Sequence, residues 1–137
     1  MKDHIVLCGS SATARALIAR IPKDCLVVVK DQGTADALVG SGVPAIAGDY
    51  ETAETLQRAG VDVSRAVIAA SIEDSENAFV CLTAKRLAPS VPVLALVSTE
   101  ENAAKLEEVR ADHIIAPALL GATEVLKALP PGVSGHD

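Results

Sequence analysis

Short apolar runs alternate along the chain with stretches in which apolar residues recur every three or four positions. Several of the runs are apolar at every position, which is typical of parallel strands covered on both faces. The runs predict six strands, at Ile5–Cys8, Leu26–Lys30, Ala45–Ala47, Ala66–Ala69, Val93–Val97 and His113–Ile115.

The segments between these runs have the spacing of amphipathic helices, in which one side of the helix is apolar. Pro22 closes the first helix, and Ser41-Gly42 ends the second one before the third strand. The third helix begins at Glu51 or Thr52 and stops at Gly60. The predicted apolar faces are Ala14, Leu17, Ile18 and Ile21 in the first helix, and Ala35, Leu38, Val39 and Gly42 in the second.

Regular alternation of strand and helix predicts an α/β fold built from βαβ units. Two three-strand halves give a Rossmann-like, doubly wound, six-stranded parallel sheet with strand order 3-2-1-4-5-6. We expect one domain over residues 1–130, with a protruding C-terminal helix that ends at Pro130-Pro131-Gly132. Residues 131–137 are expected to form a flexible tail.

Composition limits the class of protein. Half of the 137 residues are hydrophobic, but the chain has one Phe, one Tyr and no Trp, so the core must be aliphatic. No apolar run approaches the roughly 18 residues of a membrane span, and no signal peptide is evident, so we expect a soluble cytoplasmic domain. The net charge is −6 with scattered basic residues, which argues against a nucleic-acid partner. Cys8, Cys25 and Cys81 fall in apolar stretches and are expected to be reduced core residues.

The first strand leads into Gly9-Ser10-Ser11-Ala12-Thr13-Ala14. This segment is a degenerate form of the dinucleotide-binding G-x-G-x-x-G motif, in which Ser11 and Ala14 replace the second and third glycines. A helix that begins near Ala12 offers free N–H groups and a positive dipole end to a phosphate, and Ser10, Ser11 and Thr13 add hydroxyls. Ser11 stands where a second glycine normally meets a pyrophosphate, so a mononucleotide fits the loop as well as NAD does. The alternative is that Gly9 only makes a tight turn.

Further candidate ligands follow the second and third strands, at the same edge of the sheet. Lys30 and Asp31 lie near the position of the acidic residue that holds a ribose; Asp31 could bind a ribose hydroxyl, and Lys30 could favour a phosphate. Asp49 could bind a base or ribose, or cap a turn instead. Tyr50 could stack on an adenine.

The fourth strand is followed by the acidic stretch "SIEDSEN", which supplies two more candidates, Ser71 and Glu73. The carboxylates of Glu73, Asp74 and Glu76 are interpreted either as charge at a helix N-terminus or as a cation site.

No catalytic set is expected. His4 and His113 lie at the amino ends of strands, away from the predicted ligand edge, and His136 lies in the tail. No Ser-His-Asp or Cys-His arrangement can therefore form there. A reactive thiol at Cys8, beside the loop, is the alternative.

The strand and loop order resembles the RCK family (regulators of potassium conductance, also called KTN or TrkA-N domains). The matching stretches are "HIVLCGSS", "GVPAIAGDYETAETLQRAGVDVSRAVIAAS", "EDSENAFVCLTAKRL" and "ADHIIAPALLGATEVLKAL". Gly48-Asp49, the Leu56…Ala59-Gly60-Val61 segment and the Asp74–Asn77 block are the specific part of the match. Within the family, the chain looks most similar to the cytoplasmic domains of bacterial voltage-gated-type potassium channels.

The resemblance implies a non-enzymatic regulatory domain at the inner face of the cell membrane. Such domains form homodimers or ring-type homo-oligomers below the pore subunit of a potassium channel, bind an adenine nucleotide (AMP, ADP or ATP) or NAD(H), and gate the pore. Two helices with apolar residues on several sides fit such pairing, Ala78–Leu87 and the last helix. The alternatives are a regulatory subunit of a potassium uptake or efflux transporter and, in another class, a small NAD(P)-dependent oxidoreductase.

One departure from the family limits the expected ligands. In calcium-gated relatives, carboxylates at the end of the fourth strand and along the fifth bind the ion. The corresponding stretches here read Ala69-Ala70-Ser71 and Leu96-Val97-Ser98, so we expect no calcium gating by that route.

Overall fold

The computed structural model describes residues 1–133 and contains a six-stranded, all-parallel sheet. The strand order is β3-β2-β1-β4-β5-β6, which confirms the predicted Rossmann-like topology. The strands are β1 (Ile5–Cys8), β2 (Cys25–Val29), β3 (Ala45–Ala47), β4 (Ala66–Ala69), β5 (Val93–Leu96) and β6 (His113–Ile115). The helices are α1 (Ala12–Arg20), α2 (Gln32–Gly40), α3 (Ala53–Arg58), α4 (Asp74–Leu87), α5 (Glu100–Glu108) and α6 (Pro117–Ala128), with a 3-10 turn, η1 (Val61–Val63).

Four strands have the predicted bounds, whereas β2 begins and ends one residue earlier than expected and β5 ends one residue earlier. Lys30 leaves the sheet because the next residue, Asp31, already occupies the extended cap position of α2. Val97 lies just beyond β5, although its N–H still donates to the Ile115 carbonyl at 3.0 Å. Strand ends commonly shift by one or two residues in this way.

Helices α1, α2, α3 and α5 begin where a short polar side chain can accept a hydrogen bond from the first turn. Ser11, Asp31, Thr52 and Thr99 each accept from the backbone N–H three residues further along. These side chains satisfy N–H groups that have no partner inside the helix. The cap at Thr52 resolves the predicted start of the third helix, whose first helical residue is Ala53.

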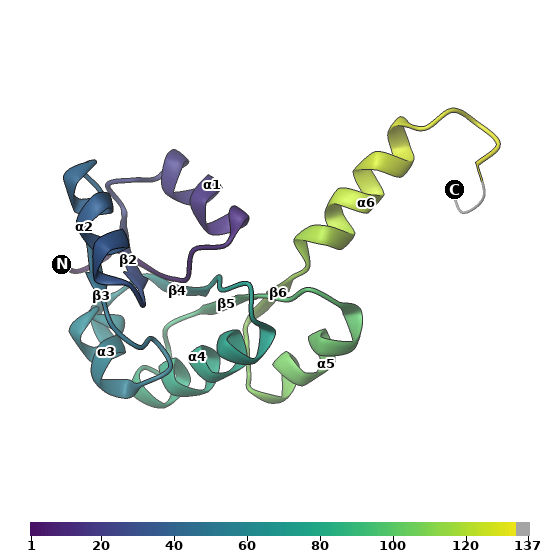
Figure 1. Cartoon of the computed structure of the whole chain (residues 1–137). Helices are drawn as coiled ribbons and strands as arrows, with labels where there is room; N and C mark the ends of the chain where they lie inside the picture. The colour runs from purple at the N-terminus through teal and green to yellow at the C-terminus, as the bar shows by residue number, and fades with distance from the viewer. Residues whose placement is uncertain (134–137) are drawn as a thin grey trace.

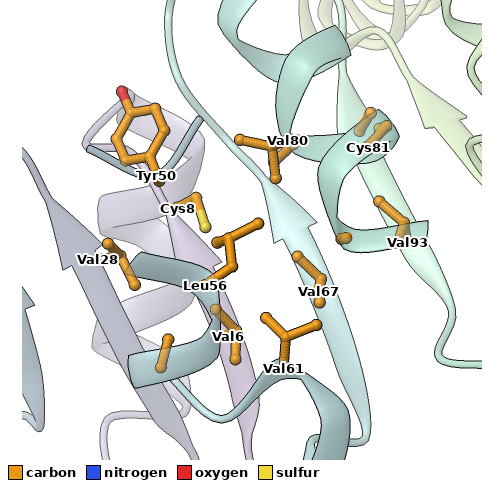
Figure 2. Packing of buried hydrophobic residues seen from close by; sticks show 14 of the residues in the cluster. Val6, Cys8, Val28, Tyr50, Leu56, Val61, Val67, Val80, Cys81 and Val93 are labelled. Carbon is orange, nitrogen blue, oxygen red and sulfur yellow. The ribbon is translucent and has the colours of Figure 1, made fainter. Parts of the chain in front are cut away.

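Helices cover both faces of the sheet, with α1 and α2 on one face and α3, α4 and α5 on the other (Figure 1). Each face has its own aliphatic cluster. The larger cluster lies under α3 and α4, where Leu56, Val67 and Val80 are fully buried (Figure 2). Burial on both faces explains why β2 is apolar at all five positions.

Apolar side chains on α2 and on α6 are exposed. Val39, which we expected in the buried face of α2, is 56% exposed. Helix α2 packs against the edge of the sheet at β3, so only the stripe with Ala35 and Leu38 is covered. Helix α6 projects away from the sheet, as predicted, and contains no buried residue (Figure 1).

The three cysteines are free and buried, as predicted. Burial raises the pKa of the Cys8 thiol far above its ordinary value. The alternative of a reactive thiol at Cys8 is therefore wrong, because a reactive cysteine needs a lowered pKa and access to solvent.

Within residues 1–133, no helix is both long and apolar enough to cross a bilayer. His136 and the greater part of the predicted tail, residues 134–137, lie outside the described residues.

Candidate ligand-binding cleft

The loop after β1 lies at the switch point of the sheet, between the two halves. Gly9 adopts a φ of +118°, and a Cβ there would lie 2.5 Å from the Ser71 nitrogen and 2.6 Å from the Ala70 carbonyl carbon. Its N–H donates to the Val28 carbonyl at 3.0 Å. The backbone after β4 thus approaches the loop so closely that only glycine fits.

Ser11 is 9% exposed, and its hydroxyl accepts from the Ala14 N–H at 3.2 Å. Its own N–H donates to the Ala70 carbonyl at 3.3 Å. The side chain that replaces the second glycine is therefore engaged as a helix cap, rather than extended over the loop. Ala12 and Thr13 lie in the first turn of α1, where backbone N–H groups have no partner inside the helix.

Several hollows flank this loop, and two of them lie where a bound nucleotide is expected, at the carboxyl ends of the strands. The hollow on the β2 side, which we call the β2 lobe, encloses about 160 Å³, and the hollow on the other side, the β5 lobe, about 250 Å³. The β2 lobe is lined by Gly9, Ser10, Val29, Lys30, Asp31, Thr34 and Tyr50. The β5 lobe is lined by Ser11, Ala12, Thr13, Ser71, Ile72, Asp74, Leu96, Val97, Ser98, Pro117 and Ala118.

A hydrogen-bonded network joins the ends of β2, β3 and β4 around the carboxylate of Glu76. One oxygen accepts from the hydroxyls of Tyr50, at 2.8 Å, and Ser71. The other oxygen binds the Lys30 ammonium, which also lies 3.9 Å from Glu51. The sequence suggested Glu76 only as helix-terminal charge or a cation ligand, because nothing local to it reveals partners 5 to 46 residues away.

The network shifts the pKa of its members. Burial raises the pKa of Glu76, but the bonds from Lys30, Ser71 and Tyr50 outweigh burial and leave the pKa below its ordinary value. The bond to Glu76 raises the pKa of Lys30. Burial is also the main reason that the pKa of Tyr50 rises to about 12. The carboxylate and the ammonium therefore both keep their charge throughout the neutral range.

Tyr50 is only 5% exposed, with its ring in the larger aliphatic cluster and the Lys30 ammonium 5.2 Å from the ring centre. That burial leaves little ring surface for the predicted stacking on an adenine. Asp49 is exposed and accepts from the Glu51 N–H at 3.0 Å, which fits the alternative that it caps a turn. Glu73 occupies the cap position of α4 without a side-chain cap bond.

Asp31 caps α2 through one oxygen, Oδ2, which accepts from the Thr34 N–H at 2.8 Å and the Thr34 hydroxyl at 2.9 Å. These bonds lower the pKa of the carboxyl. The other oxygen, Oδ1, accepts no hydrogen bond from residues 1–133. Asp31 can therefore still accept a hydrogen bond from a ribose hydroxyl.

Asp74 and Asn77 have structural roles that sequence reasoning missed. Asp74 accepts from the Ser98 N–H and hydroxyl and from the Asn102 amide. Asn77 is fully buried; its amide bonds both backbone groups of Ser71 and the Leu96 carbonyl. Helix α4 is thereby tied to the ends of β4 and β5, and the "EDSEN" block carries the residues that do this.

Arg15 was also not identified from the sequence as a residue of the cleft. It lies one turn into α1, and its guanidinium donates to the Ser10 carbonyl at 3.4 Å. This places an exposed cation beside the glycine loop.

The two described histidines lie away from this edge of the sheet. In residues 1–133, no three His, Cys, Asp or Glu side chains gather in a way that could hold a metal ion. His4 is buried just before β1 with Nε2 2.7 Å from the Ala59 carbonyl, and His113 opens β6. Both histidines therefore lie at the opposite, amino edge of the sheet, as predicted.

Residues 5–117 match the TrkA-N domain, which covers most of the chain. The chain belongs to the TrkA-N domain family. It is 30% identical, over 93% of its length, to the voltage-gated potassium channel Kch of Escherichia coli strain K12. It spans 32% of the length of Kch, so it corresponds to one part of that channel.

Solved structures share this fold. The TrkA-N domain of the inner membrane protein YbaL from Escherichia coli superposes with a TM-score of 0.87 at 19% identity, and covers 95% of this chain and 98% of that one. The GsuK channel bound to NAD superposes with a TM-score of 0.80 at 25% identity, over 92% of this chain and 23% of the channel chain. GsuK has also been solved with ADP, with a TM-score of 0.83 at 23% identity, over 93% of this chain and 34% of that one.

Proposed function

We propose that this domain is the cytoplasmic regulatory domain of a potassium channel, and that it binds an adenine nucleotide or NAD(H) in the cleft around Gly9 without catalysis. The observation that carries the proposal is the open cleft at the switch point of a TrkA-N domain that is 30% identical to a channel. The amino-edge positions of His4 and His113 favour sensing over an oxidoreductase.

The phosphate of the ligand lies over the first turn of α1. The dipole of the helix and its N–H groups favour an anion there, and Arg15 adds a positive charge beside Ser10. The β2 lobe then receives the ribose, with Asp31 as acceptor for a hydroxyl. In NAD the second nucleotide extends into the β5 lobe, whereas a mononucleotide leaves that lobe empty.

Helix α4 couples the cleft to the rest of the assembly. Glu76 near its start binds Lys30 and Tyr50, which line the β2 lobe. Asp74 holds the loop after β5, and Phe79, one turn after Glu76, is 53% exposed. A ligand that contacts both lobes favours one position of α4 over another, and this differential contact is what gating requires.

Assembly uses the unpartnered side chains of α6. Leu120 and Val125 are 61% and 60% exposed, on a helix of 12 residues that projects from the body of the domain. A lone helix of that length is marginal in water, and a patch of this kind marks an interface. We propose that α6 packs against a second copy of the chain in a homodimer or a larger ring.

Light scattering tests the assembly. Leu120→Glu combined with Val125→Glu is expected to convert the dimer or ring to monomer, whereas Val39→Glu, at an equally exposed apolar site on α2, leaves the assembly intact. A wild-type chain that is monomeric at high concentration would contradict this part of the proposal.

A thermal-shift screen with AMP, ADP, ATP, NAD⁺ and NADH tests the ligand. A ligand that binds only the folded state, at a free concentration 100 times its Kd, stabilises the domain by about 2.7 kcal/mol. This stabilisation gives a readily measured rise in Tm. Ala12→Glu puts a carboxylate at the phosphate position while improving the helix dipole, so it should abolish the rise without loss of stability. Ala16→Glu, an exposed site one turn along α1, is the matched control and keeps the rise.

A further inference from the structure

The lysine that follows β2 has a specific meaning in this fold. The residue at this point lies against the 2′ position of the adenosine ribose: an acidic side chain binds the 2′-hydroxyl, and a cation accommodates a 2′-phosphate. Lys30 lines the β2 lobe at that position, so its identity alone favours a 2′-phosphorylated nucleotide.

The structure gives Lys30 another partner. Its ammonium binds the Glu76 carboxylate, with Glu51 3.9 Å away and the Tyr50 ring beneath it. The charge of Lys30 is therefore already neutralised before any ligand arrives.

The Glu76 side chain is fixed in place, so it would not move with Lys30 if Lys30 turned towards a ligand. Its side chain is 18% exposed, and Tyr50 and Ser71 hold its other oxygen in place. If Lys30 turned to a phosphate, it would leave a partly buried carboxylate without its counter-charge, which is costly.

The negative charge around Lys30 also disfavours the binding of a 2′-phosphate. The carboxylates of Glu76 and Glu51 lie beside the ammonium of Lys30, and Asp31 lines the same lobe as Lys30. A 2′-phosphate adds about two negative charges to an already negative site, and like charges in close contact disfavour binding strongly. A free 2′-hydroxyl has no such conflict and can donate to Asp31.

We propose that Glu76 is a specificity-determining residue, which holds Lys30 away from the ribose 2′ position so that the cleft selects nucleotides with a free 2′-hydroxyl over 2′-phosphorylated ones. The inference rests on the proposed function, since it concerns the same nucleotide site. It assigns to Glu76 a role that acts through Lys30 rather than through contact with the ligand.

Calorimetric titration with two matched pairs of probes tests it: AMP against adenosine 2′,5′-bisphosphate, and NAD⁺ against NADP⁺. We expect the wild-type chain to bind the free 2′-hydroxyl member of each pair more tightly by about tenfold or more. Glu76→Gln keeps an oxygen for Tyr50 and Ser71 but removes the charge, and should reduce that preference by about tenfold.

Two control variants separate the role of Glu76 from a general charge effect. Glu51→Gln makes the same charge change 3.9 Å from Lys30 without releasing it from Glu76, and should alter the preference by less than about threefold. Glu76→Gln combined with Lys30→Met should restore the preference, because the released ammonium is gone. Circular dichroism checks that each variant is folded.

The outcomes separate the two proposals. Equal wild-type affinity for both members of a pair, or a preference that Glu76→Gln leaves unchanged, overturns the inference while the nucleotide site stands. If no probe binds the wild-type chain, the proposed nucleotide site falls, and this inference falls with it.

Discussion

Replacement of Gly9 by alanine tests the geometry on which the whole cleft depends. The new Cβ would lie 2.5 Å from the Ser71 nitrogen and 2.6 Å from the carbon and oxygen of Ala70. All three are backbone atoms at the end of β4, so no side chain can rotate to make room. The φ of +118° adds strain for any residue other than glycine.

The two effects set the expected magnitude. The unfavourable backbone conformation costs on the order of 1–3 kcal/mol, and overpacking in a closely packed region costs about 1–3 kcal/mol more. We therefore expect Gly9→Ala to lower the free energy of unfolding by roughly 2–6 kcal/mol, a large part of the stability of a domain of this size.

Urea unfolding followed by circular dichroism measures this loss, with the slope of the transition as a check on two-state behaviour. Gly40→Ala is the matched control: Gly40 ends α2, and nothing lies within 4 Å of its added Cβ. It should be neutral or stabilise by up to about 1 kcal/mol. A loss below about 1 kcal/mol for Gly9→Ala, at an unchanged slope, would refute the close approach of β4 to the loop.

Three further predictions concern the elements that support the cleft. Leu56→Ala empties a fully buried position and should cost about 2–5 kcal/mol in urea unfolding; under 1 kcal/mol would contradict the packing. Asn77→Ala leaves buried groups of Ser71 and Leu96 without partners and should cost roughly 2–4 kcal/mol. Burial raises the pKa of Asp74, but the bonds from Ser98 and Asn102 outweigh burial and leave the pKa below its ordinary value. Its contribution to stability is therefore present above the ordinary pKa of an aspartate and is lost as the pH falls below it. Asp74→Asn should flatten the unfolding free energy in that window, and an unchanged pH profile would contradict this.

The fold follows from the sequence because its signals are local. Runs such as Cys25–Val29 are apolar at each position and short, which identifies buried parallel strands, and the topology of βαβ units then leaves few arrangements. Helix starts at Ser11 and Thr52 follow from the same local chemistry. Val39 was misplaced because the sequence does not reveal that α2 covers only the edge of the sheet.

The location of the cleft was also predictable, because parallel strands bring their carboxyl ends to one edge. The partners within it were not. Lys30 and Tyr50 lie 46 and 26 residues before Glu76 in the chain. Only the folded structure shows that the Glu76 carboxylate accepts hydrogen bonds from both side chains. Asp31 and Asp49 illustrate the same limit, since the same carboxylate can cap a turn or meet a ligand.

A titration of the ¹⁵N-labelled chain with NAD⁺ and with ADP, followed through its backbone amide signals, tests the central claim most directly. The account predicts shifts concentrated at residues 9–13, 30–34 and 71–74, with the amino edge at His4 and His113 unchanged. Saturating shifts in that pattern for either ligand would support a nucleotide-sensing cleft. The absence of shifts at ligand concentrations up to about 1 mM would contradict it, because a Kd above 1 mM corresponds to a binding free energy weaker than about −4 kcal/mol. Shifts centred on the amino edge would also contradict it.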